Sequence, residues 1–322
     1  MVRARRLFGQ QRRDEKRVTV TANLPSDALT AQVLERWAMT PFPFKPIKHN
    51  ALVVSLARLW LGLRASGPEK VIFTATTGRS GTLSLAKLFA AVPGCRSVHE
   101  GHPVMNGSVL RAASYGDAAL VNRVYRQVKS INILRAAVGY RYYLEANHLF
   151  IKTFIRNAID EFGDRLCVIH LVRPALEVAT SIYQLRDCPG TERGNYWWLE
   201  YHAPTNLIQI ARILETDPEF SHPFYKALWY WHEIEARVSA WRVRVPTLNV
   251  TSFETRWLND LDRVCGLLDS LGMAYERSAI DAVVGRREHA KEHEKNPMDL
   301  CGDQLAGMEL KFRKLLESLG YL

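Results

Sequence analysis

The stretch Val71-Ile72-Phe73-Thr74-Ala75-Thr76-Thr77-Gly78-Arg79-Ser80-Gly81-Thr82 decides the fold expected for this chain. Its first five residues are β-branched or apolar and predict a short buried strand. A loop with two glycines follows, and apolar residues then recur at helical spacing from Leu83 to Phe89. In such a turn, backbone N–H groups and the positive end of the helix face one point, which predicts a phosphate or sulfate site. An ordinary strand-to-helix turn is the alternative.

The side chains of this loop suit an anion but depart from the loop of nucleoside triphosphatases. Arg79 adds a permanent charge, and Ser80 and Thr82 add hydroxyl donors. In the pattern G-x-x-x-x-G-K-[ST], Phe73 would replace the first glycine and Arg79 the lysine. Those enzymes also need a carboxylate for magnesium at the end of a neighbouring strand, where this chain has Arg173. These differences count against a kinase.

Buried strands and helices alternate along the rest of the chain. We expect strands at 71–75, 95–99, 149–152, 166–172 and 247–250, and helices at 117–139, 155–162, 174–186, 204–214, 223–243, 256–271 and 303–319. The aromatic stretch 187–203 is predicted as a loop, either a lid over a ligand or part of the core. This alternation predicts an α/β fold, a central parallel β-sheet with helices on both faces. Ligands in such sheets bind at the carboxyl ends of the strands.

Composition and charge set wider bounds on the protein. The 322 residues are 47% hydrophobic and 24% charged, which is typical of a globular protein, and no apolar run is long enough to span a membrane. Five cysteines without a CxxC pair argue against a disulfide framework or zinc ribbon and favour a cytoplasmic location. Residues 1–67 are interpreted as a basic N-terminal extension with a Pro-rich joint and a short helix at 51–63, and 68–322 as the α/β domain.

The net charge of +10 is concentrated at the N-terminus, where the first 17 residues hold seven basic and two acidic residues. Such a run is most often a solvated tail, and contact with an anionic membrane surface or with nucleic acid is the minority alternative. The remaining charge suits an anionic ligand such as a nucleotide. No nucleic-acid partner is expected.

A second segment connects the predicted anion-binding loop, residues 76–82 (the anion loop), to a known family. Arg173 ends the strand at 166–172, and Ser181 follows eight residues later in the next helix. Together with Gly78-Arg79-Ser80-Gly81-Thr82, the segment 171–181 resembles the sulfotransferases that use 3′-phosphoadenosine 5′-phosphosulfate (PAPS). The segment 247–273 is similar to a late strand-and-helix unit of that family. The resemblance covers about residues 70–275, and it implies a P-loop-like α/β fold and metal-independent sulfonate transfer that leaves 3′-phosphoadenosine 5′-phosphate (PAP).

The resemblance also assigns roles to residues. Arg79 and Lys152 would stabilise the leaving oxygen, with Lys152 at a strand end. The residues expected to bind the donor are Thr77, Gly78, Arg79, Ser80, Gly81, Thr82, Leu83, Arg173 and Ser181, with Arg286 and Arg287 from a late loop.

The base that takes the acceptor's proton is predicted in Val98-His99-Glu100-Gly101-His102-Pro103. The family's histidine two residues after the lysine is Phe154 here, so Glu100 is the expected base, as in tyrosylprotein and carbohydrate sulfotransferases. His99 and His102 are the alternatives, or they orient Glu100. A metal site at these three residues, and another at His289 and His293, are disfavoured.

The sequence therefore predicts a PAPS-dependent sulfotransferase acting on an acceptor hydroxyl. A P-loop small-molecule kinase, or a non-catalytic nucleotide- or polyanion-binding protein, stays open as an alternative. The acceptor is also open among carbohydrate, lipid-linked sugar, tyrosine and small metabolite, because acceptor pockets are built from variable loops.

Overall fold

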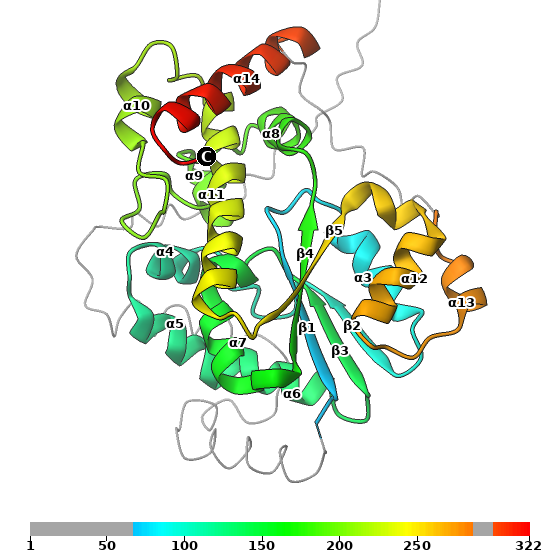
Figure 1. Ribbon diagram of the computed structural model, residues 1–322. Helices are drawn as coiled ribbons and strands as arrows, with labels where there is room; N and C mark the ends of the chain where they lie inside the picture. The colour runs from blue at the N-terminus through cyan, green and yellow to red at the C-terminus, as the bar shows by residue number, and fades with distance from the viewer. Residues whose placement is uncertain (1–66, 286–298) are drawn as a thin grey trace, which may run out of the picture.

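A computed structural model describes residues 67–285 and 299–322 (Figure 1). At its centre is a sheet of five parallel strands in the order β2-β3-β1-β4-β5. The strands are β1 (Lys70–Ala75), β2 (Cys95–His99), β3 (Tyr142–Ala146), β4 (Leu166–Val172) and β5 (Asn249–Glu254). The predicted α/β class is confirmed.

Helices cover both faces of this sheet (Figure 1). One face packs on α3 (Thr82–Ala90), α12 (Leu261–Ser270) and α13 (Arg277–Asp281), through a core that includes Leu85, Phe89 and Leu268. The larger core on the other face includes Phe73, Phe150 and Trp229. The elements of that side are α4 (Ser108–Ser114), α5 (Ala118–Val124), η1 (Tyr125–Lys129), α6 (Ser130–Ala136), η2 (Phe150–Phe154), α7 (Ile155–Phe162), α8 (Ala175–Gln184), α9 (Glu192–Trp197), α10 (Ala211–Thr216), α11 (Pro223–Arg244) and α14 (Gly302–Ser318).

The predicted strand at 149–152 is wrong. The strand is β3, at Tyr142–Ala146, and 150–154 is the π-helical turn η2. Two features of the sequence explain the error. Glu145 makes β3 look exposed, yet its carboxylate is fully buried and paired with Lys129. The apolar run around Phe150 and Ile151 is a buried helical turn, which periodicity cannot separate from a short strand.

Three other boundaries also move. The segment 204–210 is not helical, because the Glu233 carboxylate accepts the backbone N–H groups of Leu207 and Ile208, and α10 begins only at Ala211. The last strand runs later than predicted, to Glu254, and is followed by the 3-10 turn η4 (Thr255–Asn259). Asp260 then caps α12 through its side chain. The predicted loop 187–203 contains the short helix α9.

The remaining predicted helices are found close to their expected ranges. The helix expected at 117–139 is continuous but changes to π-helical winding at η1, which carries the buried Lys129. Within the residues described, no helix combines the length and apolarity needed to cross a membrane. The predicted N-terminal extension, apart from Gly67, lies outside the described residues.

Candidate functional site

The loop between β1 and α3 lies at the carboxyl edge of the sheet and is shaped by its own hydroxyl groups. The Thr77 and Ser80 side chains are buried, and both hydroxyls donate to the carbonyl of Gly78. The predicted role of Ser80 as a hydroxyl donor to an anion stays a prediction, and in this structure its hydroxyl donates within the loop. Gly78 and Gly81 have positive φ angles of 85° and 79°, and Gly81 is the N-cap of α3. These two positions need glycine.

The backbone of this loop presents donors without partners. In the described part of the chain, no protein acceptor takes the backbone N–H groups of residues 78–82. Successive free N–H groups at a helix N-terminus form a concave site for an anionic oxygen. The main chain of the loop is therefore suited to a phosphate or sulfate group, and the anion site stays a prediction.

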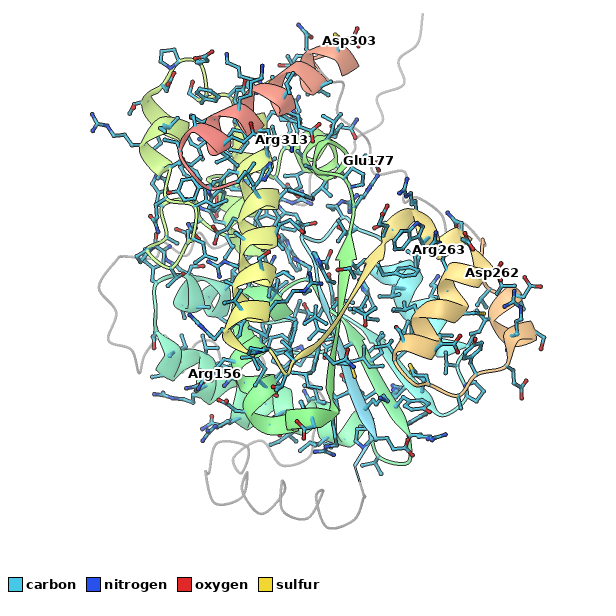
Figure 2. The ribbon with its side chains drawn as sticks, viewed as in Figure 1. Arg156, Glu177, Asp262, Arg263, Asp303 and Arg313 are labelled. Atoms are coloured by element: carbon cyan, nitrogen blue, oxygen red, sulfur yellow. The ribbon has the colours of Figure 1, made fainter. Side chains whose placement is uncertain are left out.

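Arginine side chains from two distant segments meet beside this loop. Arg79 Nε donates to Ser181 Oγ at 3.0 Å, and an N–H of the Arg173 guanidinium donates to the carbonyl of Arg79 at 2.7 Å. Partial burial, and then the charge of Arg173, lower the pKa of Arg79, although it stays cationic. Arg173 also pairs with Glu177, which Figure 2 shows on α8 at the edge where β4 ends. The two predicted nucleotide segments are therefore neighbours in space.

Backbone conformation singles out the same region. Among the described non-glycine residues, those with positive φ are Arg79, Glu100, Met105 and Arg186. Two of these are residues that the sequence analysis assigned to catalysis. A left-handed conformation costs a residue with a Cβ on the order of 1–2 kcal/mol, and such strain gathers at functional sites.

Glu100 follows β2 directly, and its side chain lies at the same edge of the sheet. Its backbone N–H donates to Ala146 at the end of β3, and its carboxylate oxygen is 3.6 Å from Nε2 of His148. The side chain is 27% exposed, so an acceptor can reach it. His99 Nε2 lies 3.0 Å from the hydroxyl of Thr82, which joins the Glu100 strand to the first turn of α3. His102 is exposed.

The buried ion pair of Lys129 with Glu145 contacts the turn that follows Glu100. The Lys129 ammonium pairs with Glu145 and also donates to the Gly101 carbonyl at 2.6 Å. Asn147 donates to Glu145 and to the carbonyl of Val104. These contacts hold the backbone at both ends of the segment 101–104, which directly follows Glu100.

Lys152 does not lie at a strand end, which corrects the sequence prediction. It is in η2, is 3% exposed, and its Nζ contacts three protein groups: His148 Nδ1 at 2.8 Å, the Trp197 carbonyl at 3.0 Å and Tyr230 Oη at 2.8 Å. Burial lowers the pKa of Lys152 well below its ordinary value, while the charge of Glu100 opposes this change. All three donor positions of an ammonium are occupied within the protein.

Several residues of the site were missed by sequence reasoning. His148 follows β3, so the misplaced strand hid its position at the carboxyl edge. Tyr230 donates to the Thr77 carbonyl, and the one hydroxyl proton of Thr255 is shared between the carbonyls of Ser80, at 2.9 Å, and Val172, at 3.1 Å. A correct assignment of β3 would have indicated His148. Nothing in the local sequence marks Tyr230 or Thr255, because their roles depend on how α11 and η4 pack.

Four of the residues discussed above cannot be placed. Arg286, Arg287, His289 and His293 lie outside the described residues. Among the residues that are described, no group of three His, Cys, Asp or Glu side chains is arranged to hold a metal ion. Leu83 is exposed in the first turn of α3.

Comparisons with solved structures find similarity at low sequence identity. No family model and no curated protein matches the chain. The chain is similar to the crystal structure of a sulfotransferase from Alicyclobacillus acidocaldarius, with 15% identity, a TM-score of 0.42, and coverage of 78% of this chain and 95% of that one. It is also similar to the sulfotransferase domain from the curacin biosynthetic pathway, with 12% identity, a TM-score of 0.45, and coverage of 79% and 98%.

Proposed function

We propose that this chain is a sulfotransferase that moves a sulfonate group from PAPS to an acceptor hydroxyl, with Glu100 as the general base. One observation carries the proposal. The Arg79–Ser181 hydrogen bond joins residues 102 positions apart, and these are the residues that the two family-like segments assign to the two phosphate ends of the donor.

The donor would be held by main-chain and guanidinium groups. The free N–H groups of residues 78–82 and the Arg79 guanidinium suit the 5′-phosphosulfate, and Arg173 with Ser181 suits the 3′-phosphate. Arg286 and Arg287 are retained as further donor-binding candidates. The donor supplies the sulfonate. Arg79 and the loop stabilise the charge that develops where the bond to the 5′-phosphate breaks.

Glu100 would take the proton from the acceptor. The acceptor oxygen forms the new bond to sulfur, the bond from sulfur to the 5′-phosphate breaks, and the proton of the hydroxyl moves to the Glu100 carboxylate. A general base must be exposed to substrate, and Glu100 is partly exposed and directly precedes a segment whose backbone is held at both ends. His99 and His102 remain the alternative bases.

A metal-independent reaction is part of this proposal, and Arg173 supports it. In phosphoryl transfer by P-loop enzymes, a carboxylate at a strand end holds magnesium. Here a guanidinium occupies the end of β4 and contacts the loop itself. The reaction we propose therefore uses the fixed positive charges of arginine side chains. A cytoplasmic location is a separate part of the proposal.

Calorimetry with PAP and with ATP, each with and without magnesium, tests the donor class. We expect PAP to bind without magnesium and more tightly than ATP, because two phosphate sites recognise two separate phosphate groups. Incubation with PAPS labelled in its sulfonate and a panel of acceptor sugars, tyrosine peptides and small metabolites then tests transfer. Tighter, magnesium-dependent binding of ATP would support a kinase instead. Binding that accepts any polyanion and falls steeply with salt would support a polyanion-binding protein.

A further inference from the structure

A line of polar contacts connects Glu100 to the anion loop through the protein interior. His148 Nε2 is 3.6 Å from the Glu100 carboxylate, and His148 Nδ1 is 2.8 Å from Lys152 Nζ. Lys152 donates onward to Tyr230, whose hydroxyl donates to the carbonyl of Thr77. The three residues between the ends of this line, His148, Lys152 and Tyr230, are buried.

The protons along this line can be assigned by counting donors and acceptors. Tyr230 gives its one hydroxyl proton to Thr77, so its oxygen accepts from Lys152. The Trp197 carbonyl can only accept. The charge of Glu100 favours the ammonium form of Lys152 against the effect of burial, and an ammonium gives its third proton to Nδ1 of His148. Since Nδ1 accepts, the single N–H of a neutral imidazole is on Nε2, the atom that faces Glu100.

Electrostatics agree with a neutral His148. Burial lowers its pKa well below its ordinary value, and the charges of Lys152, His99 and Arg79 act in the same direction. The ring is also enclosed: a Cβ added at Gly78 would lie 3.1 Å from His148 Cγ, and the Trp198 ring centroid is 5.2 Å from that of His148. The imidazole therefore has little freedom to turn.

We infer that His148 is a positioning residue: in the tautomer that Lys152 fixes, its Nε2–H faces the Glu100 carboxylate at 3.6 Å and stabilises the negative charge of that carboxylate. The catalytic meaning of this contact rests on the proposed function, in which Glu100 is the base. Lys152 then acts through His148 and, by way of Tyr230, on the anion loop. It does not act on the leaving oxygen, which is the role that the family resemblance implied.

Other charged groups near Glu100 are already engaged. Lys129, from η1, is paired with Glu145 of β3 and donates to Gly101. His99 of β2 contacts Thr82, and Arg79 of the loop donates to Ser181. In the part of the chain that the structure describes, His148 is the polar side chain in contact with the Glu100 carboxylate.

The test compares two variants, His148→Gln and His148→Asn. The side-chain amide of each places its nitrogen where the imidazole has one of its two nitrogens. The amide nitrogen of His148→Gln reaches the place of Nε2, whereas that of His148→Asn reaches only the place of Nδ1. A carboxylate that loses a nearby N–H group takes up a proton more readily. We expect the acid limb of the kcat/KM profile to move up by about one pH unit in His148→Asn and to stay close to wild type in His148→Gln.

Lys152→Met separates this role from direct catalysis. We expect the acid limb to move as in His148→Asn, because the imidazole is free to change tautomer, and PAP binding to weaken, because Tyr230 loses its partner. Two results would overturn the inference. One is an acid limb that moves in neither His148 variant. The other is a Lys152→Met enzyme whose turnover falls equally at every pH while PAP binding is unchanged.

Nitrogen NMR of protein labelled at histidine checks the arrangement without any assay of activity. The His148 signals are those that disappear in His148→Gln. In the wild type we expect a neutral ring with its proton on Nε2 down to well below pH 6.5, and a mixture of tautomers in Lys152→Met. A proton on Nδ1, or titration near pH 6.5, would refute the inference whatever the chain catalyses. If the expected spectra appear but no acceptor is sulfated, the proposed function fails and the contact stands.

Discussion

At the scale of single residues, the arginines of the site differ from ordinary surface arginines in the partners of their guanidinium groups. Arg79 donates to the neutral hydroxyl of Ser181 and lies beside the Arg173 guanidinium, and within the described residues it forms no ion pair with a carboxylate, although the charge of Asp187 acts on it. Exposed ion pairs elsewhere, such as Arg156 with Asp160, contribute little beyond solvation. A cation of the first kind is available to an anionic ligand, and a cation of the second kind is already paired.

Replacing Arg79 tests this difference. We expect Arg79→Ala to weaken PAP binding and to lower turnover by roughly 10²–10³-fold, the usual loss for one transition-state donor. Arg156→Ala is the matched control, because Figure 2 shows it far from the carboxyl edge of the sheet, and it should leave both quantities unchanged. Calorimetry with PAP and steady-state rates measure the two effects. An Arg79→Ala enzyme with near-normal turnover would remove this residue from the mechanism.

Glu100 carries the second prediction at this scale. Glu100→Gln removes the proton acceptor but keeps the size of the side chain, so PAP affinity should be retained while turnover falls by about 10²–10⁴-fold. Glu69→Gln, at the opposite edge of the sheet in an exposed pair with Arg141, is the control and should behave as wild type. Full activity in Glu100→Gln would mean that the proton goes to another group, with His99 and His102 the next to test.

At the scale of elements, the anion loop is held by neighbours from four different segments. Tyr230 of α11 and Thr255 of η4 restrict the movement of the loop, because each donates a hydrogen bond to one of its carbonyls. Trp198, after α9, and His148, after β3, press against Gly78. The loop therefore keeps its free N–H groups pointing to one side without help from a ligand.

Gly78→Ala probes this enclosure. A new Cβ would lie 3.0–3.2 Å from Trp198 and His148 and would also meet a positive φ of 85°. Gly116 has nearly the same φ, 83°, but open space around it, so Gly116→Ala carries the conformational cost alone. We expect Gly78→Ala to lose about 1–3 kcal/mol more of the free energy of unfolding and to bind PAP at least tenfold more weakly. Chemical denaturation and calorimetry measure this, and equal losses in both variants would show that the loop is not tightly enclosed.

At the scale of the whole molecule, the late helix α14 closes the larger core by packing on α8 and α11. His232 of α11 lies at this contact, with its ring centroid 5.9 Å from that of Phe312. Burial lowers the pKa of His232 to about 4, and the charge of Arg313 adds to this effect. Figure 2 shows Arg313 on α14, across from α11.

The protein should therefore lose stability in weak acid. The unfolded chain takes up a proton at His232 near pH 6.5, and the folded chain does so only near pH 4, so the free energy of unfolding falls as pH decreases between these values. From pH 7.5 to pH 5 the contribution of His232 is about 2 kcal/mol. His232→Leu should remove this part of the slope, as measured by denaturant unfolding at several pH values. Parallel slopes for the two proteins would contradict the assignment.

The sequence by itself determined the class of fold and the place of the glycine loop between strand and helix, because both depend on local patterns. Strand, glycine loop and helix follow one another between Lys70 and Ala90, and Arg173 directly follows the strongest strand, β4. Only the tertiary structure decided how Lys152 is used and that His148 belongs to the site. A buried charged residue such as Glu145 makes its strand look like an exposed segment in the sequence. Lys152 is buried because Trp197 and Tyr230, from distant segments, accept its hydrogen bonds. Periodicity reports which residues face a core, but it does not report which polar groups meet inside it.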